Sequence, residues 1–98
     1  MAGGDEIYGF DWDAGNRGKS LKKHGITDDE SEEVFFDQKK RIFKDTVHSE
    51  TEERFILVGM SRSGKRLFIA FTFRKSVIRV ISSRPLNKKE QKLYEEKT

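Results

Sequence analysis

Three runs rich in apolar residues dominate the second half of the chain. They span residues 55–60, 66–73 and 77–83, and β-branched and aromatic side chains are frequent in all of them, which is typical of β-strands. The polar stretches between them, 61–64 and 74–76, are too short for a parallel crossover. The pattern therefore predicts an antiparallel meander of three core strands.

The beginning of the chain has a weaker pattern. Residues 1–6 show no periodicity and predict a disordered terminus. Residues 7–12 (IYGFDW) alternate, and they predict a short strand with Ile7 and Phe10 as its apolar anchors.

A first helix is predicted over residues 14–24. Asp13 is placed as its N-cap, because a carboxylate can accept a backbone N–H of the first turn. Gly15 and Gly18 each weaken this helix by about 1 kcal/mol relative to alanine. Gly25 is placed to end it in a left-handed conformation.

A second helix is predicted from a capping-box spacing. Thr27 stands three residues before Glu30, so each side chain can bond the backbone N–H of the other residue. We expect this helix to end near Asp37. Residues 42–43 then predict a short edge strand, and residues 45–53 an exposed loop.

The only proline precedes a third helix. Pro85 has no N–H to donate, so it is expected to end the last strand. Asn87 and Glu90 repeat the capping-box spacing at the start of a helix over residues 88–97. The sequence therefore predicts one small two-layer α+β domain over residues 1–98. Its antiparallel sheet has three core strands and one or two short strands, with two N-terminal helices and one C-terminal helix.

Strict alternation sorts the strand residues onto two faces of the sheet. It gives the middle strand an unbroken apolar face made of Leu67, Ile69, Phe71 and Phe73. It divides the last strand into two sets, Val77, Arg79, Ile81 and Ser83 on one face, and Ile78, Val80, Ser82 and Arg84 on the other. We expect one well-covered side of the sheet and one side that is open at its arginine end.

Charge is distributed unevenly along the chain. Residues 1–53 hold 14 acidic and eight basic side chains, a net charge of −6, and residues 54–98 hold three acidic and 12 basic ones, a net charge of +9, which together make the +3 of the whole chain. A positive potential summed over many side chains attracts phosphate. The alternative is a solvated basic face that balances the acidic helices, and charge alone favours neither.

Composition excludes several kinds of site. The chain has no cysteine, so it has neither a disulfide nor a thiolate metal site. Its two histidines lack the spacing of a metal site, and no P-loop or dinucleotide motif is present. No apolar run approaches the roughly 20 residues of a membrane span, and the N-terminus lacks the apolar core of a signal peptide. We expect a cytoplasmic protein without metal, cofactor or membrane partner.

Three arginines of the predicted sheet are candidates for phosphate binding. Arg79 lies within a strand, where it either pairs with an acid or offers two parallel N–H donors to a phosphate. Arg84 at the end of that strand is better exposed for such a role, and Arg54 begins the first core strand and could join them.

Four further side chains have two interpretations each. His24 either transfers protons or is a helix C-terminal cation favoured by the dipole, and His48, in an acidic segment, has similar alternatives. Trp12 either belongs to the core or stacks on a base. Tyr94 is either a core residue or directs its hydroxyl toward the open face.

An ordered set of short motifs runs through residues 7–95. It consists of Phe10-Asp11-Trp12-Asp13, Asn16, Lys23-His24-Gly25-Ile26, Val34-Phe35, His48-Ser49, Glu53-Arg54, Gly59, Leu67-Phe68, Ile78-Arg79-Val80-Ile81-Ser82, Arg84 and Tyr94. This set resembles the BrnT toxin family. The chain departs from the family at Ser20, where Asn is common, and at Ser83, where Ala is common.

The resemblance implies a bacterial type II toxin with a RelE-like fold, a ribonuclease that inhibits translation. It also implies a co-expressed antitoxin of the BrnA type that carries a DNA-binding domain. The complex of the two would reach operator DNA through the antitoxin alone.

Cleavage of RNA without a metal requires a base for the 2′-OH, cations for the phosphorane and an acid for the leaving oxygen. The arginines supply the cations, and the candidates for base and acid are His24, His48, Glu53 and Tyr94. Further basic residues that we expect to hold the RNA backbone are Lys22, Lys23, Arg74 and Lys75.

Two other functions remain open on the sequence. A non-catalytic binding protein would use the same basic face to dock nucleic acid or an acidic partner. A purely structural small domain is the third possibility, and the charge asymmetry disfavours it.

Overall fold

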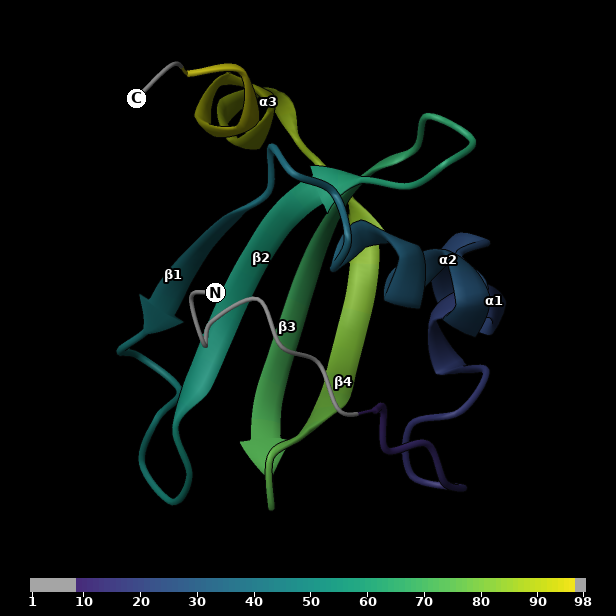
Figure 1. Ribbon diagram of the computed structural model, residues 1–98, viewed down its shortest axis with the longest axis vertical. Coiled ribbons are helices and arrows are strands. Elements are labelled where there is room, and N and C mark those ends of the chain that lie inside the picture. The colour runs from purple at the N-terminus through teal and green to yellow at the C-terminus, as the bar shows by residue number, and fades with distance from the viewer. Residues whose placement is uncertain (1–8, 97–98) are drawn as a thin grey trace.

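A four-stranded antiparallel sheet in the order β1-β2-β3-β4 forms the centre of the computed structural model, which describes residues 9–96 (Figure 1). The strands are β1 (Arg41–Asp45), β2 (Arg54–Met60), β3 (Arg66–Arg74) and β4 (Val77–Pro85). The helices are α1 (Lys19–His24), α2 (Asp28–Val34) and α3 (Lys88–Glu95). The predicted α+β class, the meander and the short edge strand are confirmed.

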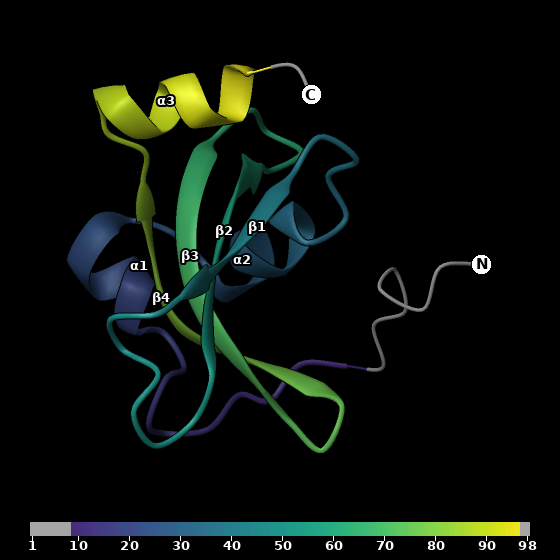
Figure 2. The ribbon, with the colours of Figure 1, turned by 90° about the vertical axis from the view of Figure 1, so that its left-hand side faces the viewer.

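One face of the sheet, which we call the inner face, carries the core. The sheet contributes buried side chains from three strands, namely Leu57, Leu67, Ile69, Phe71, Ile78 and Val80. Helix α2 and its flanks cover them with Ile26, Val34 and Phe35. Figure 2 shows the sheet nearly edge-on, with α2 on one side, α1 beside β4, and α3 across one end of the strands. The opposite, outer face is only partly covered.

The segment before α1 differs from its prediction. Phe10 forms a single parallel bridge to Ile78, and no strand forms over residues 9–12. The proposed anchor Ile7 and the predicted disordered terminus 1–6 lie outside the described residues. The bridge nevertheless fixes this segment along the free edge of β4.

Helix α1 begins later than predicted. It starts at Lys19, after a left-handed Gly18 (φ 71°), and ends at a left-handed Gly25 (φ 73°), as expected. Asp13 does not cap it, because its carboxylate accepts the N–H of Gly15 at 2.8 Å in a turn that precedes the helix. Gly18 is one of the two glycines expected to weaken the predicted helix. It interrupts that helix, because glycine adopts the left-handed conformation at little cost.

The two predicted capping boxes are both present. In α2 the Thr27 side chain accepts the Glu30 N–H, and the Glu30 carboxylate accepts the Thr27 N–H. The same reciprocal pair joins Asn87 and Glu90 at the start of α3. Helix α2 ends at Val34, earlier than predicted.

A β-bulge in β4 changes which side chains share a face. Ala70 pairs with Ser82, but Phe71 pairs with Val80, so Ile81 is an extra residue on β4. A bulge of this kind resets the alternation of side chains on the strand that carries it.

The bulge corrects the predicted faces. Ser83 lies on the inner face and is fully buried, whereas Arg79 and Arg84 both lie on the outer face, opposite Thr72 and Phe68. The prediction that placed the two arginines on opposite faces is wrong, because strict alternation ignores an inserted residue. Phe73 lies on the predicted face, opposite Ile78, but at the end of β3 it is 51% exposed.

Candidate functional site

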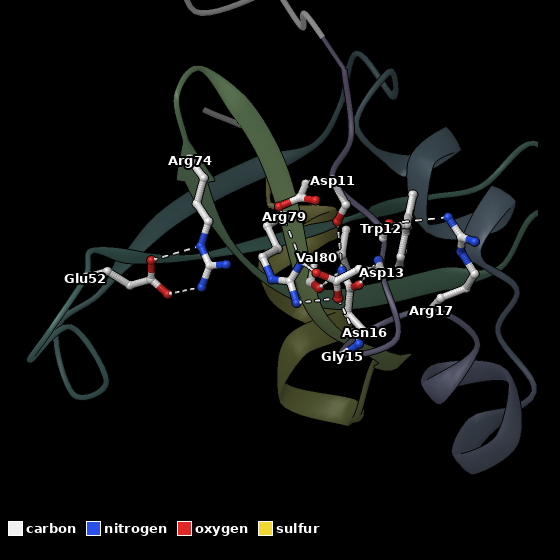
Figure 3. Close-up of polar contacts among 10 residues, drawn as sticks. All are labelled: Asp11, Trp12, Asp13, Gly15, Asn16, Arg17, Glu52, Arg74, Arg79 and Val80. Carbon is white, nitrogen blue, oxygen red and sulfur yellow. Dashed lines mark hydrogen bonds and ion pairs between the residues drawn. The ribbon is translucent and has the colours of Figure 1, made fainter.

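Arg79 is held by two carboxylates from the segment before α1 (Figure 3). Its Nη2 donates to Asp13 at 2.9 Å, and its Nη1 donates to Asp13 at 3.1 Å and to Asp11 at 3.3 Å. The bond from Arg79 is the main influence that holds the pKa of Asp13 below its usual value. Because two negative charges face one guanidinium whose side chain is only 13% exposed, this position carries no excess positive charge for a phosphate.

Asn16 fixes this segment to the edge of β4 (Figure 3). Its amide nitrogen donates to the carbonyls of Asp11 and Val80, both at 2.9 Å, and its amide oxygen accepts the Asp13 N–H at 2.8 Å. Asn16 is 6% exposed, and all of these bonds are internal. Its place in the motif set is explained by structure rather than by chemistry with a substrate.

Arg84 occupies a different environment on the outer face. Its Nη1 and Nη2 donate to the two carboxylate oxygens of Glu90 at 2.8 and 2.7 Å, and Nη1 also donates to the Pro85 carbonyl at 3.1 Å. Its guanidinium lies 3.9 Å from the ring centroid of Phe68. The bonds to Glu90 are the largest influence on Arg84 and raise its pKa, while the pKa of Glu90 is lowered.

One edge of the Arg84 guanidinium has no acceptor among residues 9–96. A guanidinium has five N–H donors, and Glu90 and Pro85 take three of them. The remaining two, on Nε and Nη2, are parallel and match two oxygens of a phosphate. Since the side chain is 35% exposed, this edge is suited to bind an anion.

A cleft of about 590 Å³ joins Arg84 to the basic helix α1. Its lining residues are Lys19, Ser20, Lys22, Lys23, His24, Ile81, Ser82 and Arg84. We call it the Arg84 cleft. Residues three and four apart share one side of a helix, so the three lysines stand together, and no carboxylate of the described chain lies within ion-pair distance of them. Like charges on neighbouring turns repel each other and destabilise a helix slightly. An anion bound in the cleft would offset this repulsion between the lysines of α1.

Three serines fix the geometry of this cleft. The Ser20 hydroxyl of α1 accepts the Ser83 N–H at 2.9 Å, which joins α1 to β4. The Ser83 hydroxyl in turn lies 2.7 Å from the hydroxyl of Ser31 on α2. The two departures from the family pattern, Ser20 and Ser83, therefore contact each other, and no buried side-chain polar atom among the described residues lacks a partner.

Several predicted site residues lie at the other end of the strands. His48 bonds Asp45 at 2.9 Å, Glu53 pairs with Lys44 at 3.0 Å, and Arg54 lies opposite Asp45 in the sheet. Arg74 pairs with Glu52 at 3.3 Å, and Lys75 follows it in the β3–β4 turn. None of these residues lines the Arg84 cleft.

Trp12 contributes to the core, as one of its two interpretations predicted. Its ring packs on the buried cluster of the inner face, and its indole nitrogen donates to Glu32 at 2.7 Å.

Tyr94 lies in a second, separate cleft of about 990 Å³ between β1, the segment before it and α3. Its hydroxyl donates to Asp37 at 2.6 Å, and the same carboxylate oxygen accepts the Met60 N–H at 2.8 Å. Burial, followed by the bond to Asp37, raises the pKa of Tyr94 to about 12. The tyrosine is therefore neutral at physiological pH and bound to a structural partner.

Sequence reasoning missed six residues around Arg84: Lys19, Ser20, Ile81 and Ser82, which line the cleft, and Phe68 and Glu90, which contact the guanidinium. The capping-box spacing identified Glu90, but only as a helix cap. The sequence did contain a signal, because Glu90 follows Arg84 by only six residues. So short a connection places an arginine at the end of a strand next to the first turn of the following helix. Within residues 9–96, no three metal-ligating side chains gather, and no helix has the length and apolar character to cross a membrane.

Comparison with known proteins adds an independent finding. A family model described as ribonuclease toxin, BrnT, of type II toxin-antitoxin system matches residues 12–90. The matched segment contains the whole Arg84 cleft and ends at Glu90. No curated protein matches the chain.

Proposed function

Since the chain belongs to the BrnT family of type II ribonuclease toxins, we propose that it cleaves RNA without a metal ion, and that the Arg84 cleft is where it does so. The proposal rests chiefly on one observation. Arg84 presents two parallel N–H donors beside three lysines that lack carboxylate partners within the described chain. Such an arrangement binds phosphate oxygens and stabilises the negative charge of a phosphorane.

Of the four residues nominated for proton transfer, His24 is the one that lines the Arg84 cleft. An imidazole can accept the proton of a 2′-OH or donate one to the leaving oxygen. We assign His24 to one of these two steps and Arg84 to charge stabilisation. Lys22 and Lys23 hold the RNA backbone.

We extend the proposal to the biological role that the family resemblance implies. Cleavage of messenger RNA in the cytoplasm would inhibit translation, and a cognate antitoxin of the BrnA type with a DNA-binding domain would neutralise the toxin. Contact with operator DNA would occur through the antitoxin.

The test is incubation of the purified protein with bulk RNA in EDTA, beside Arg84→Ala and Lys44→Ala. Lys44 also carries one positive charge but lies on β1, at the far edge of the sheet. We expect the parent and Lys44→Ala to cleave equally, and Arg84→Ala to lose about 10²-fold in rate, as when one charge-stabilising donor is removed.

Two outcomes would contradict the proposal in different ways. Equal cleavage by Arg84→Ala would exclude the Arg84 cleft as the site. If no variant cleaves free RNA, the same set is added to a translating extract. Intact messenger RNA there would exclude the ribonuclease and favour a binding protein.

A further inference from the structure

The end of the Arg84 side chain is fixed on two sides. Glu90 accepts one hydrogen bond on each carboxylate oxygen from Nη1 and Nη2, at 2.8 and 2.7 Å. Phe68, directly opposite Arg84 in the sheet register, packs against its guanidinium at 3.9 Å. A bidentate pair sets the rotation of a guanidinium within its plane, and an aromatic face sets the orientation of that plane.

Glu90 is itself held by the N-terminal cap of α3. The carboxylate oxygen that accepts from Arg84 Nη1 also accepts the Asn87 N–H at 2.9 Å, and the Glu90 N–H donates to Asn87 at 2.9 Å. Its side chain is only 13% exposed. The backbone N–H of Asn87 therefore holds the Glu90 carboxylate in place for Arg84, whereas the Asn87 side chain bonds only the Glu90 backbone.

The consequence is a defined free edge. With Nη1 saturated by Glu90 and Pro85, the two donors that remain are those of Nε and Nη2. They form the side edge of the guanidinium, and they can engage one phosphate without displacing Glu90. A carboxylate bound to the Nε–Nη2 edge would have to be displaced before phosphate could bind there. Glu90 is bound to the other edge of the guanidinium, so phosphate can bind while Glu90 stays in place.

We propose that Glu90 and Phe68 are positioning residues that hold the Nε–Nη2 edge of Arg84 for a phosphate of single-stranded RNA. This inference rests on the proposed function of the Arg84 cleft for its substrate. It adds that the first turn of α3 and the first part of β3 belong to the active site, although neither Glu90 nor Phe68 lines the cleft.

The experiment compares four variants. Glu90→Gln keeps the size of the side chain and one oxygen acceptor for the capping box, but its amide NH₂ group replaces a carboxylate oxygen that accepted from the guanidinium. Phe68→Leu removes the aromatic ring. Phe68→Tyr restores the ring, and Asn87→Ala weakens the cap of α3 while leaving Glu90 and Arg84 intact. Cleavage of a single-stranded RNA oligonucleotide gives kcat and KM. The NMR resonance of the Arg84 Nε–H during titration with inorganic phosphate reports the edge directly.

We expect Glu90→Gln and Phe68→Leu to lower kcat about tenfold or more with little change in KM, because misplacement of a group affects the transition state most. Phe68→Tyr and Asn87→Ala should retain the parent kcat. The Arg84 Nε–H should shift with phosphate in the parent and in Asn87→Ala, but not in Glu90→Gln.

The outcomes separate this inference from the proposed function. Parent-like kcat and a parent-like phosphate shift in Glu90→Gln would overturn the positioning role. Loss of kcat in Asn87→Ala equal to that in Glu90→Gln would also overturn it, because helix capping would then explain the effect. If the parent cleaves no RNA, the phosphate titration still decides whether Glu90 orients Arg84, and only the ribonuclease is then refuted.

Discussion

Tyr94 gives the clearest prediction at the scale of a single residue. Its folded-state pKa, about 12, lies above the ordinary value of 10.0, since burial and the Asp37 carboxylate disfavour the phenolate. A raised pKa means that the stabilisation is complete below pH 10 and is lost as the pH rises through 12. We therefore expect the unfolding free energy of the parent to fall over this range relative to that of Tyr94→Phe.

An absorbance titration of the folded protein checks the same residue. The chain has two tyrosines, and the parent should show a phenolate component with a midpoint near 12 that Tyr94→Phe lacks. A parent curve that is complete near pH 10, with no such component, would show that Asp37 does not hold the Tyr94 proton.

Arg79 and Arg84 show what could be predicted at this scale. Both were identified from the sequence as strand arginines, and the alternatives for Arg79 included an acidic partner. The partners themselves could not be chosen, because Asp11 and Asp13 are brought to Arg79 by the edge of β4, more than 60 residues away in the chain. The Arg84–Glu90 pair could have been predicted from the sequence, because Glu90 follows Arg84 by only six residues and was already recognised as part of the capping box of α3.

At the scale of elements, α3 is held on the sheet mainly by charge. It buries no residue completely, and Leu93 is 37% exposed. Three arginines from three strands pair with carboxylates of α3 or its C-cap, and the pairs are Arg84–Glu90, Arg66–Glu95 and Arg41–Glu96. The last two carboxylates are 59% and 62% exposed. Exposed pairs of this kind contribute about 0.2–1 kcal/mol each and are screened by salt.

We therefore expect salt to loosen α3 before the sheet. Raising the salt from about 0.1 M to about 1 M shortens the Debye length from about 10 to about 3 Å. Amide hydrogen exchange of Gln91–Tyr94 should accelerate several-fold, while exchange of Ile69 in β3 stays unchanged. The double variant Glu95→Gln/Glu96→Gln should show the faster exchange already at low salt. Equal acceleration in α3 and β3 would mean that the helix opens only with the whole fold.

The elements also differ in how well the sequence specifies them. Both capping boxes were predicted because a box is a local pattern of two side chains and two backbone groups. The start of α1 and the bulge at Ile81 were not, since each depends on contacts with another segment. Asp13 is paired with Arg79 of β4 instead of capping the predicted helix, and a bulge exists only in the pairing of β3 with β4.

For the whole molecule, the fold redistributes the charges of the chain. The sequence placed the positive charge in the C-terminal half, yet Lys19, Lys22 and Lys23 belong to the acidic N-terminal half and meet Arg84 of the basic half in one cleft. Arg74 of the basic half is instead paired with Glu52. Local potential therefore follows the contacts between elements rather than the sum over either half.

This arrangement predicts how salt affects RNA binding. Lys22→Ala/Lys23→Ala and Arg74→Ala/Lys75→Ala each remove two positive charges, but from opposite ends of β4. With a slope of about −0.7 per phosphate contact for single strands, the first double variant should reduce the magnitude of the log–log salt slope by about 1.4. The second should leave it unchanged. Binding of a 2′-deoxy oligonucleotide at several salt concentrations measures both slopes, and a reduction confined to Arg74→Ala/Lys75→Ala would place the RNA at the β3–β4 turn.

The inserted Ile81 has a consequence for how β4 tolerates mutation. Ser83 follows Val80 by three residues and yet lies on the same face, so deleting one residue between them would restore strict alternation and leave Ser83 in the core and Arg84 on the outer face. Exchanging the Ile81 side chain would change neither direction. The directions of Ser83 and Arg84 therefore survive both substitution of Ile81 and loss of one residue at the bulge, and related sequences are expected to vary here in both ways.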